Sequence, residues 1–215
     1  MINNLVVFDF ETTGVDINTC QPVQVAALGI DFHNLRILDN HFSSFIRPED
    51  FSNIEPGALS FHAKARGLTE SQVLELWREA PDLKVVWNDF SQYVRQHNPT
   101  GNKFDAPVPA GHNIVNFDLP IYRRINGRFT NGKPVFSDLH FFDTMNLSLL
   151  WLHAKDIRKY NMDSLRDYFG MSQASKDHAH DALSDVKDTA ELLIRYLRIT
   201  RNFASKVRFE GAFSS

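Results

Sequence analysis

Two acidic residues close a short apolar run near the start of the chain, and this pattern constrains the fold more than any other feature. Leu5 to Phe10 reads LVVFDF, a β-branched and aromatic run that predicts a strand, and Glu11 follows it directly. Because strand side chains alternate between faces, Asp9 and Glu11 project to the same side, roughly 7 Å apart along the chain. Burying two carboxylates costs several kcal/mol each unless cations neutralise them. The pattern predicts either a site for hard divalent cations, which prefer oxygen ligands, or a pair on a solvated sheet edge.

The remaining segments predict an α/β architecture. Further strands are expected at 23–32, 35–46 and 107–111, and helices at 70–77, 81–94, 118–126, 144–153, 163–168 and 182–198. Thr69 and Asp143 are expected N-caps. The segment 126–133, with two Asn-Gly pairs, is expected to be a surface loop or hairpin. This order predicts one domain over 1–215, a mixed sheet with helices packed on it, with a core at about 5–198 and a short basic tail at 199–215.

Composition excludes several classes of protein. With 43% hydrophobic and 23% charged residues the chain is not intrinsically disordered. No apolar run approaches the ~20 residues that span a membrane, and no signal peptide is visible, so we expect a cytoplasmic protein without a membrane partner. The single cysteine, Cys20, fits a reducing compartment, and an incidental role is favoured over a nucleophilic one. The net charge of −3 is unlike that of most nucleic-acid binders, but two divalent cations would reverse its sign.

Two further segments carry candidate chemistry. Asp118 follows Phe117 at the start of an expected helix, where taken alone it is best interpreted as a cap. His180 precedes Asp185 by five residues, which places a histidine at a helix mouth beside a carboxylate on the helix. That arrangement suits a general base next to a metal, although such a pair also arises often by chance.

Together these segments resemble the three motifs of the DEDDh exonucleases, the DnaQ-like family that includes the proofreading subunit of bacterial DNA polymerase III and ribonuclease T. The matching stretches are FDFETTG at 8–14, GHNIVNFD at 111–118 and HDALSD at 180–185. Weaker landmarks are Asp143-Thr144 and Asp163-Ser164-Leu165. The resemblance extends over roughly 5–196, and all five expected catalytic positions are filled.

The resemblance implies a fold and an activity. The fold is ribonuclease H-like: a mixed five-stranded sheet, antiparallel in its first three strands and then parallel, with helices on both faces. The activity is 3′→5′ exonuclease at single-stranded 3′ ends of DNA, with RNA left open, releasing nucleoside 5′-monophosphates with two Mg²⁺ or Mn²⁺ ions. The catalytic set would be Asp9, Glu11, Asp118 and Asp185 on the metals and His180 as general base. His178, two residues upstream, is a rival base.

Other implications concern substrate and partners. By analogy, Thr12, Thr13, His62 and Asn113 line the pocket for the 3′ nucleotide, although the 62–67 stretch is looser than in the family. The arginines at 195, 198 and 201, and those at 123, 124 and 128, either contact phosphates or lie on solvated helix faces. A polymerase or another replication or repair protein is a candidate partner, in proofreading for example, and a homodimer is left open. The alternative function is a non-catalytic nucleic-acid-binding or polymerase-accessory module of the same fold.

Overall fold

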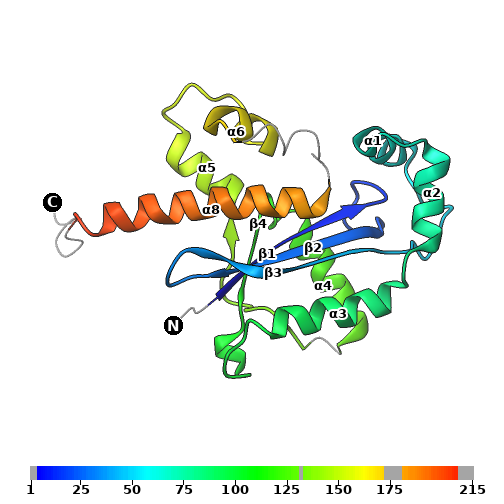
Figure 1. Ribbon diagram of the computed structural model, residues 1–215, viewed down its shortest axis with the longest axis horizontal. Helices are drawn as coiled ribbons and strands as arrows, with labels where there is room; N and C mark the ends of the chain where they lie inside the picture. The colour runs from blue at the N-terminus through cyan, green and yellow to red at the C-terminus, as the bar shows by residue number, and fades with distance from the viewer. Residues whose placement is uncertain (1–3, 131–132, 172–180, 208–215) are drawn as a thin grey trace.

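The strand that carries Asp9 and Glu11 is the middle strand of a five-stranded sheet (Figure 1). The computed structural model describes residues 4–130, 133–171 and 181–207. The strands are β1 (Asn4–Thr12), β2 (Pro22–Asp31), β3 (Arg36–Phe45), β4 (Val108–Gly111) and β5 (Phe142–Asp143), in the spatial order β3-β2-β1-β4-β5. Pairing is antiparallel from β1 to β2 and from β2 to β3, and parallel from β1 to β4 and from β4 to β5. The expected mixed sheet is confirmed.

Helices cover both faces of this sheet, as expected. They are α1 (Pro56–Arg66), α2 (Glu70–Glu79), α3 (Leu83–Arg95), α4 (Asp118–Phe129), α5 (Thr144–Leu152), α6 (Met162–Phe169) and α8 (Ala182–Ala204), with a 3-10 turn η1 (Lys103–Asp105). Side chains of β1 alternate between two cores: Val6 and Phe8 pack with α3 and α4, whereas Leu5 and Val7 pack under α8. By the same alternation, Asp9 and Glu11 lie on the α8 face.

Smaller clusters attach the outer helices. α1 and α2 pack together around Val73 and Trp77, near the end of β1 (Figure 1). α5 and α6 pack on the outer side of α8 through Leu152 and Leu165. These two helix pairs therefore flank the place where β1 ends and α8 begins.

Local chemistry sets the expected helix ends. Thr69 accepts from the backbone amide of Gln72, and the Gln72 side chain accepts from the amide of Thr69, which completes a capping box. Asp143 accepts from the amide of Met145 at the start of α5. Gly170 closes α6 in the left-handed conformation, with a φ of 61°. The two expected N-caps, Thr69 and Asp143, are confirmed.

The expected loop at 126–133 is wrong in its first half. α4 continues to Phe129, and Asn126 is buried rather than at a surface turn. Its Nδ2 donates to the carbonyl of Lys133 at 3.2 Å inside the fold. Packing of Ile125 and Phe129 against the core outweighs the turn preference of the Asn-Gly pair.

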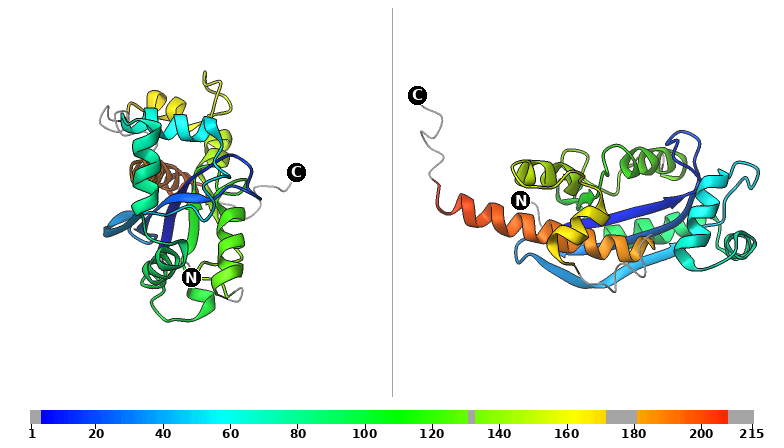
Figure 2. Two further views of the ribbon diagram at one scale, coloured as in Figure 1. Left: turned by 90° about the vertical axis from the view of Figure 1, so that its right-hand side faces the viewer. Right: turned by 90° about the horizontal axis from the view of Figure 1, so that it is seen from above.

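The last helix is longer than expected, since α8 ends at Ala204 instead of near Arg198. Its final residues are exposed, and the red end of the helix extends past the sheet (Figure 2). No Gly or Pro interrupts the sequence between those two positions, so nothing stops the helix earlier. In the described parts of the chain, no helix combines the length and the apolar stretch that spanning a membrane requires.

Candidate active site

Three carboxylates from two distant segments meet where α8 begins over β1. Asp9 and Glu11 come from β1, and Asp185 comes from the first turn of α8. One oxygen from each lies within 4.8 Å of the others. Oxygen ligands sit about 2.0–2.6 Å from Mg²⁺ or Ca²⁺, so oxygens about 4–5 Å apart can share one ion. The group therefore fits a hard divalent cation.

Asp118 reaches the same place from the other side of β1. Its Oδ1 accepts from the backbone amide of Phe10 at 2.9 Å, and the residue is 2% exposed. β1 pairs with β4 only from Leu5 to Val7, so the amide of Phe10 has no strand partner on that edge. The hydrogen bond holds Asp118, the first residue of α4, beside the three-carboxylate group without making it a member of that group.

Burial and mutual repulsion raise the pKa values of these carboxyls. The pKa of Asp9 lies well above its ordinary value, because of burial first and then the charges of Asp118, Glu11 and Asp185. Burial and the charge of Asp185 raise the pKa of Glu11 to about 8. Burial raises the pKa of Asp118 to about 7, against the hydrogen bond from Phe10. Bound cations would remove this repulsion, so the electrostatics also fit a metal site.

A chain of side chains links Glu11 to α1. His62 is 2% exposed, and its Nε2 donates to the carbonyl of Thr12 at 2.9 Å, which leaves Nδ1 as an acceptor. Arg66 donates to that Nδ1 at 3.1 Å, and Nδ1 lies 3.9 Å from Glu11 Oε2. His62 therefore lies beside Glu11 and Thr12, at the C-terminal end of β1. Its predicted contact with substrate stays a prediction.

The same chain continues to α8. Arg66 also donates to Gln24 Oε1 at 2.6 Å, and Gln24 donates from Nε2 to Asp181 Oδ1 at 2.7 Å. Gln24 lies opposite Glu11 in the β1–β2 ladder. Asp181 is the N-cap residue of α8, so this network holds the start of α8 beside the acidic group.

Thr12 and Thr13 are buried and serve the turn after β1. Thr12 Oγ1 donates to the carbonyl of Gly14 at 2.7 Å, and Thr13 Oγ1 accepts from the amide of Gln21 at 3.0 Å. Both therefore shape the backbone next to Glu11. The prediction that they line a nucleotide pocket stays untested.

Asn113 lies in a turn that Asp143 holds. It has a φ of 58°, a left-handed conformation that asparagine tolerates better than most residues. Asp143 accepts from the amides of Asn113 at 3.0 Å, Val115 at 3.4 Å and Met145 at 2.9 Å. The neighbouring His112 bonds Thr144 through Nδ1 at 2.9 Å. The motif segment that leads to Asp118 is therefore anchored at the start of α5.

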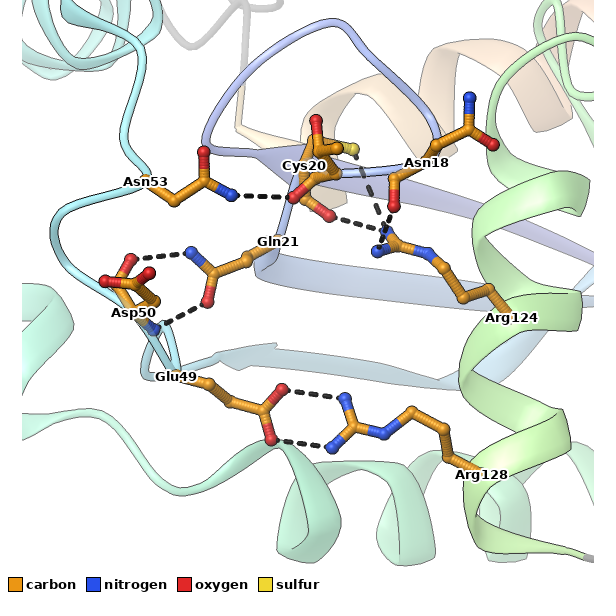
Figure 3. A network of polar contacts seen from close by, with 9 residues as sticks. Asn18, Cys20, Gln21, Glu49, Asp50, Asn53, Arg124 and Arg128 are labelled. Carbon is orange, nitrogen blue, oxygen red and sulfur yellow. Dashed lines mark hydrogen bonds and ion pairs between the residues drawn. The ribbon is translucent and has the colours of Figure 1, made fainter.

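Arg124 and Arg128 of α4 are engaged within the protein (Figure 3), whereas Arg123 on the same helix is exposed. Arg124 donates to the carbonyls of Asn18 and Cys20, at 3.2 and 2.5 Å, and so holds the turn after β1. Arg128 forms a two-bond ion pair with Glu49, at 2.7 and 2.9 Å. These contacts favour a structural role over phosphate binding for both.

The arginines late in α8 also contact the protein. Arg201 donates to the carbonyls of His33 and Phe32, and Arg195 pairs with Glu191 on its own helix. Arg198 lies 3.5 Å from the carbonyl of Leu35. Two of the three therefore hold the β2–β3 turn against α8, a role that neither sequence-based interpretation included.

Arg166 is a residue of the site that the sequence analysis did not identify. Arg166 of α6 is 1% exposed and donates to Asp185, to Asp188 at 2.6 Å and to Asp163 at 3.0 Å. The available signal was its position on the inward face of α6 beside Leu165, where an apolar residue is expected.

His180, the candidate base, and its rival His178 lie outside the described residues.

Cys20 is buried, and burial raises the pKa of its thiol. A buried thiol kept in its protonated form is a poor nucleophile, which favours the incidental interpretation.

Comparisons with known proteins agree with this geometry. A family model described as an exonuclease matches residues 6–193. A DNA polymerase III PolC-type of Caldanaerobacter subterraneus subsp. tengcongensis is 28% identical over 89% of this chain. A ribonuclease T of Shewanella frigidimarina is 28% identical over 87% of this chain and 79% of its own length. The chain spans only 11% of the polymerase.

Solved structures show the same fold. E. coli exonuclease I, in complex with a dT13 oligonucleotide, superposes with a TM-score of 0.66 at 18% identity, over 94% of this chain and 43% of that one. Cell-death related nuclease 4 superposes with a TM-score of 0.66 at 15% identity, over 92% of this chain and 64% of that one. The expected ribonuclease H-like fold is confirmed.

Proposed function

This chain belongs to the exonuclease family, and from that premise we propose that it is a metal-dependent 3′→5′ exonuclease that releases nucleoside 5′-monophosphates from single-stranded 3′ ends. The observation that carries the proposal is the group formed by Asp9, Glu11 and Asp185, whose oxygens lie within 4.8 Å of one another. A module that only binds nucleic acid has no need of three partly buried carboxylates that repel one another and the phosphate backbone.

The carboxylates are assigned to two Mg²⁺ or Mn²⁺ ions. Asp9, Glu11 and Asp185 would hold one ion, Asp9 would also be a ligand of the second, and Asp118 would complete the site. When bound, such ions would supply a nucleophilic water at neutral pH and charge stabilisation for the leaving 3′-oxygen. The protein keeps its carboxylates preorganised, and the hydrogen bond from Phe10 to Asp118 is one such restraint.

His180 is assigned as the general base that accepts the proton of the attacking water. A histidine with an ordinary pKa of about 6.5 is neutral, and so able to accept a proton, above that pH. Support on the described chain comes from Asp181, the residue that follows His180 in sequence. Its carboxylate accepts from Gln24, which lies opposite Glu11 in the β1–β2 ladder.

Single-stranded DNA is the first substrate to test. The exonuclease I structure holds a DNA oligonucleotide, and the ribonuclease T relative makes matched RNA the second substrate. A polymerase partner is suggested only by the PolC-type relative, of which the chain matches a small share.

The assay uses a 5′-labelled single strand, a matched duplex and a matched RNA, each with Mg²⁺, Mn²⁺ or EDTA. Cleavage from the 3′ end should give a ladder of products that shorten one nucleotide at a time, with release of 5′-monophosphates. EDTA should stop the reaction, and excess Mg²⁺ should restore it.

The matched control is Asp9→Asn, which keeps the shape of the side chain and removes one anionic ligand. It should bind the oligonucleotide without shortening it. Degradation that continues in EDTA contradicts the metal mechanism. A wild-type protein that retains oligonucleotide with Mn²⁺ but never shortens it is the binding module of the alternative.

A further inference from the structure

Arg166 is a buried cation in direct contact with one of the proposed metal ligands. It is 1% exposed, and its Nη2 donates to Asp185 Oδ1. Its Nε donates to Asp188 Oδ2 at 2.6 Å, and its Nη1 donates to Asp163 Oδ1 at 3.0 Å. All three guanidinium nitrogens thus donate to carboxylates, and two of these carboxylates belong to α8.

Helix packing alone does not explain this residue. Arg166 lies on the face of α6 that also carries Leu165 and, one turn away, Met162 and Phe169. A leucine or methionine there would join α6 to α8 without the desolvation cost of several kcal/mol that a buried charge carries. The ionic contacts therefore suggest a task besides cohesion.

The geometry of the two α8 partners indicates that task. Asp185 and Asp188 are three residues apart, so they lie on the same side of α8. The guanidinium is planar and rigid, and it donates to one oxygen of each carboxylate at once. Asp188, with its side chain 11% exposed, acts as a second anchor that prevents Arg166 from rotating. The Asp185 carboxylate is thereby held at a fixed orientation.

We propose that Arg166 is a positioning residue for the metal site: it orients Asp185 through Oδ1, so that the carboxylate meets Asp9 and Glu11 in ligand geometry. The inference rests on the proposed function, since it takes Asp185 as a metal ligand. Partners that orient ligands in this way typically change metal affinity or activity roughly 10- to 100-fold when removed.

The test measures Mn²⁺ binding to the full chain without nucleic acid, by titration calorimetry, alongside the Mn²⁺ concentration that gives half-maximal activity. Arg166→Gln should weaken Mn²⁺ binding roughly 10- to 100-fold. Arg166→Lys, which keeps the charge but loses the planar fork, should recover part of that loss. Asp188→Asn should weaken binding to a smaller extent, because the guanidinium loses its second anchor.

Asp163→Asn is the matched control. It changes the third partner of Arg166. The Asp163 side chain is 62% exposed and lies on the same helix as Arg166, so Mn²⁺ binding should stay at the wild-type value. All variants are compared well below their melting temperatures. This separates ligand positioning from a general loss of stability.

The proposal is overturned if Arg166→Gln melts earlier but binds Mn²⁺ as the wild type does, because the residue then only joins two helices. If that variant does not fold, Arg166→Lys and Asp188→Asn decide, and unchanged Mn²⁺ binding in both overturns it. Tighter binding in Arg166→Gln also overturns it, since Arg166 would then compete with the ion. Failure of the nuclease assay with intact Mn²⁺ binding refutes the proposed activity and leaves this measurement valid.

Discussion

Asp9 lies in β1 with three carboxylates as neighbours, and this arrangement lowers the stability of the metal-free fold while it provides ligands for a cation. Its pKa lies well above the ordinary value, because burial and the charges of Asp118, Glu11 and Asp185 all disfavour ionisation. An ionised Asp9 therefore destabilises the metal-free fold, whereas a neutral side chain of the same shape does not. Sites of this kind gain stability when a functional residue is replaced.

Asp9→Asn should therefore abolish turnover and raise the melting temperature of the metal-free protein at pH 8. A gain of 1 kcal/mol corresponds to about 2–4 °C for a chain of this size. The measurement is thermal denaturation in EDTA. Asp16→Asn is the control, since hydrogen bonds from Asn18 lower the pKa of that exposed carboxyl, and its loss should not raise stability. A melting temperature of Asp9→Asn below that of the wild type contradicts this account.

The two histidines before α8 differ in their expected effects. His180→Ala should reduce kcat about 10²–10⁴-fold, the range for a lost general base. His178→Ala should retain kcat near the wild-type value. In the wild type, kcat/KM should rise with pH through about 6.5, as the base loses its proton, and this rise should be absent in His180→Ala. If the rise disappears in His178→Ala instead, the assignment of the base is reversed.

Elements that depend on neighbouring residues were predictable from the sequence, and those that depend on distant partners were not. The caps at Thr69 and Asp143 are formed by residues two or three positions away, so the pattern was enough. Strand alternation likewise predicted the shared face of Asp9 and Glu11. The ion pair of Arg128 with Glu49 joins residues 79 positions apart, and no local pattern announces it.

The candidate site shows the same division. The motifs identified Asp118 and Asp185, but the restraint from Phe10 arises because β4 stops pairing with β1 after Val7. Arg166 meets Asp185 only because α6 packs on α8. The extended end of α4 has the same origin, since tertiary packing outweighed a local turn signal.

Asp143 tests this link between element and site. Asp143→Ala removes the acceptor of three backbone amides, in the 112–117 turn and at the start of α5, from a residue that is 4% exposed. We expect it to cost about 2–4 kcal/mol of unfolding free energy, as an N-cap loss plus unsatisfied buried amides. Activity should also fall, because the turn leads to Asp118.

Thr69→Ala is the comparison. It removes the capping box of α2, at a cost of about 1 kcal/mol, and leaves the acidic group untouched. Both unfolding free energies come from urea denaturation, and activity is measured below either transition. Equal costs for the two variants, with activity unchanged in both, would show that Asp143 is only a helix cap.

At the scale of the whole molecule, the site lies where the sheet changes from antiparallel to parallel pairing. β1 has an antiparallel neighbour on one side and a short parallel neighbour on the other. The parallel pairing ends early, which frees a backbone edge for α4, while α8 crosses the opposite face. Segments from both ends of the chain therefore converge on one strand, and the resulting carboxylate repulsion acts on the stability of the entire fold.

That coupling predicts how stability changes with pH and metal. The pKa of Glu11 is raised to about 8 and that of Asp118 to about 7, so both carboxyls bind more protons in the folded state than in the unfolded state. The stability that these two carboxyls contribute to the metal-free protein is therefore fully present below their ordinary pKa values and is lost as pH rises through the raised ones. The buried His97 and the partly buried His112 have lowered pKa values and act in the opposite direction, but only below about 6.5.

Between pH 7.0 and 8.5, then, the metal-free melting temperature should fall, and Mn²⁺ should restore it. Mn²⁺ binds the ionised carboxylates and displaces their protons, so its stabilising effect should be larger at pH 8.5 than at pH 7.0. An ion present at 100 times its Kd adds about 2.7 kcal/mol. Thermal denaturation at both pH values, with EDTA or Mn²⁺, measures the four melting temperatures. Glu11→Gln should flatten the metal-free pH dependence, and an unchanged slope in that variant would place its origin outside the acidic group.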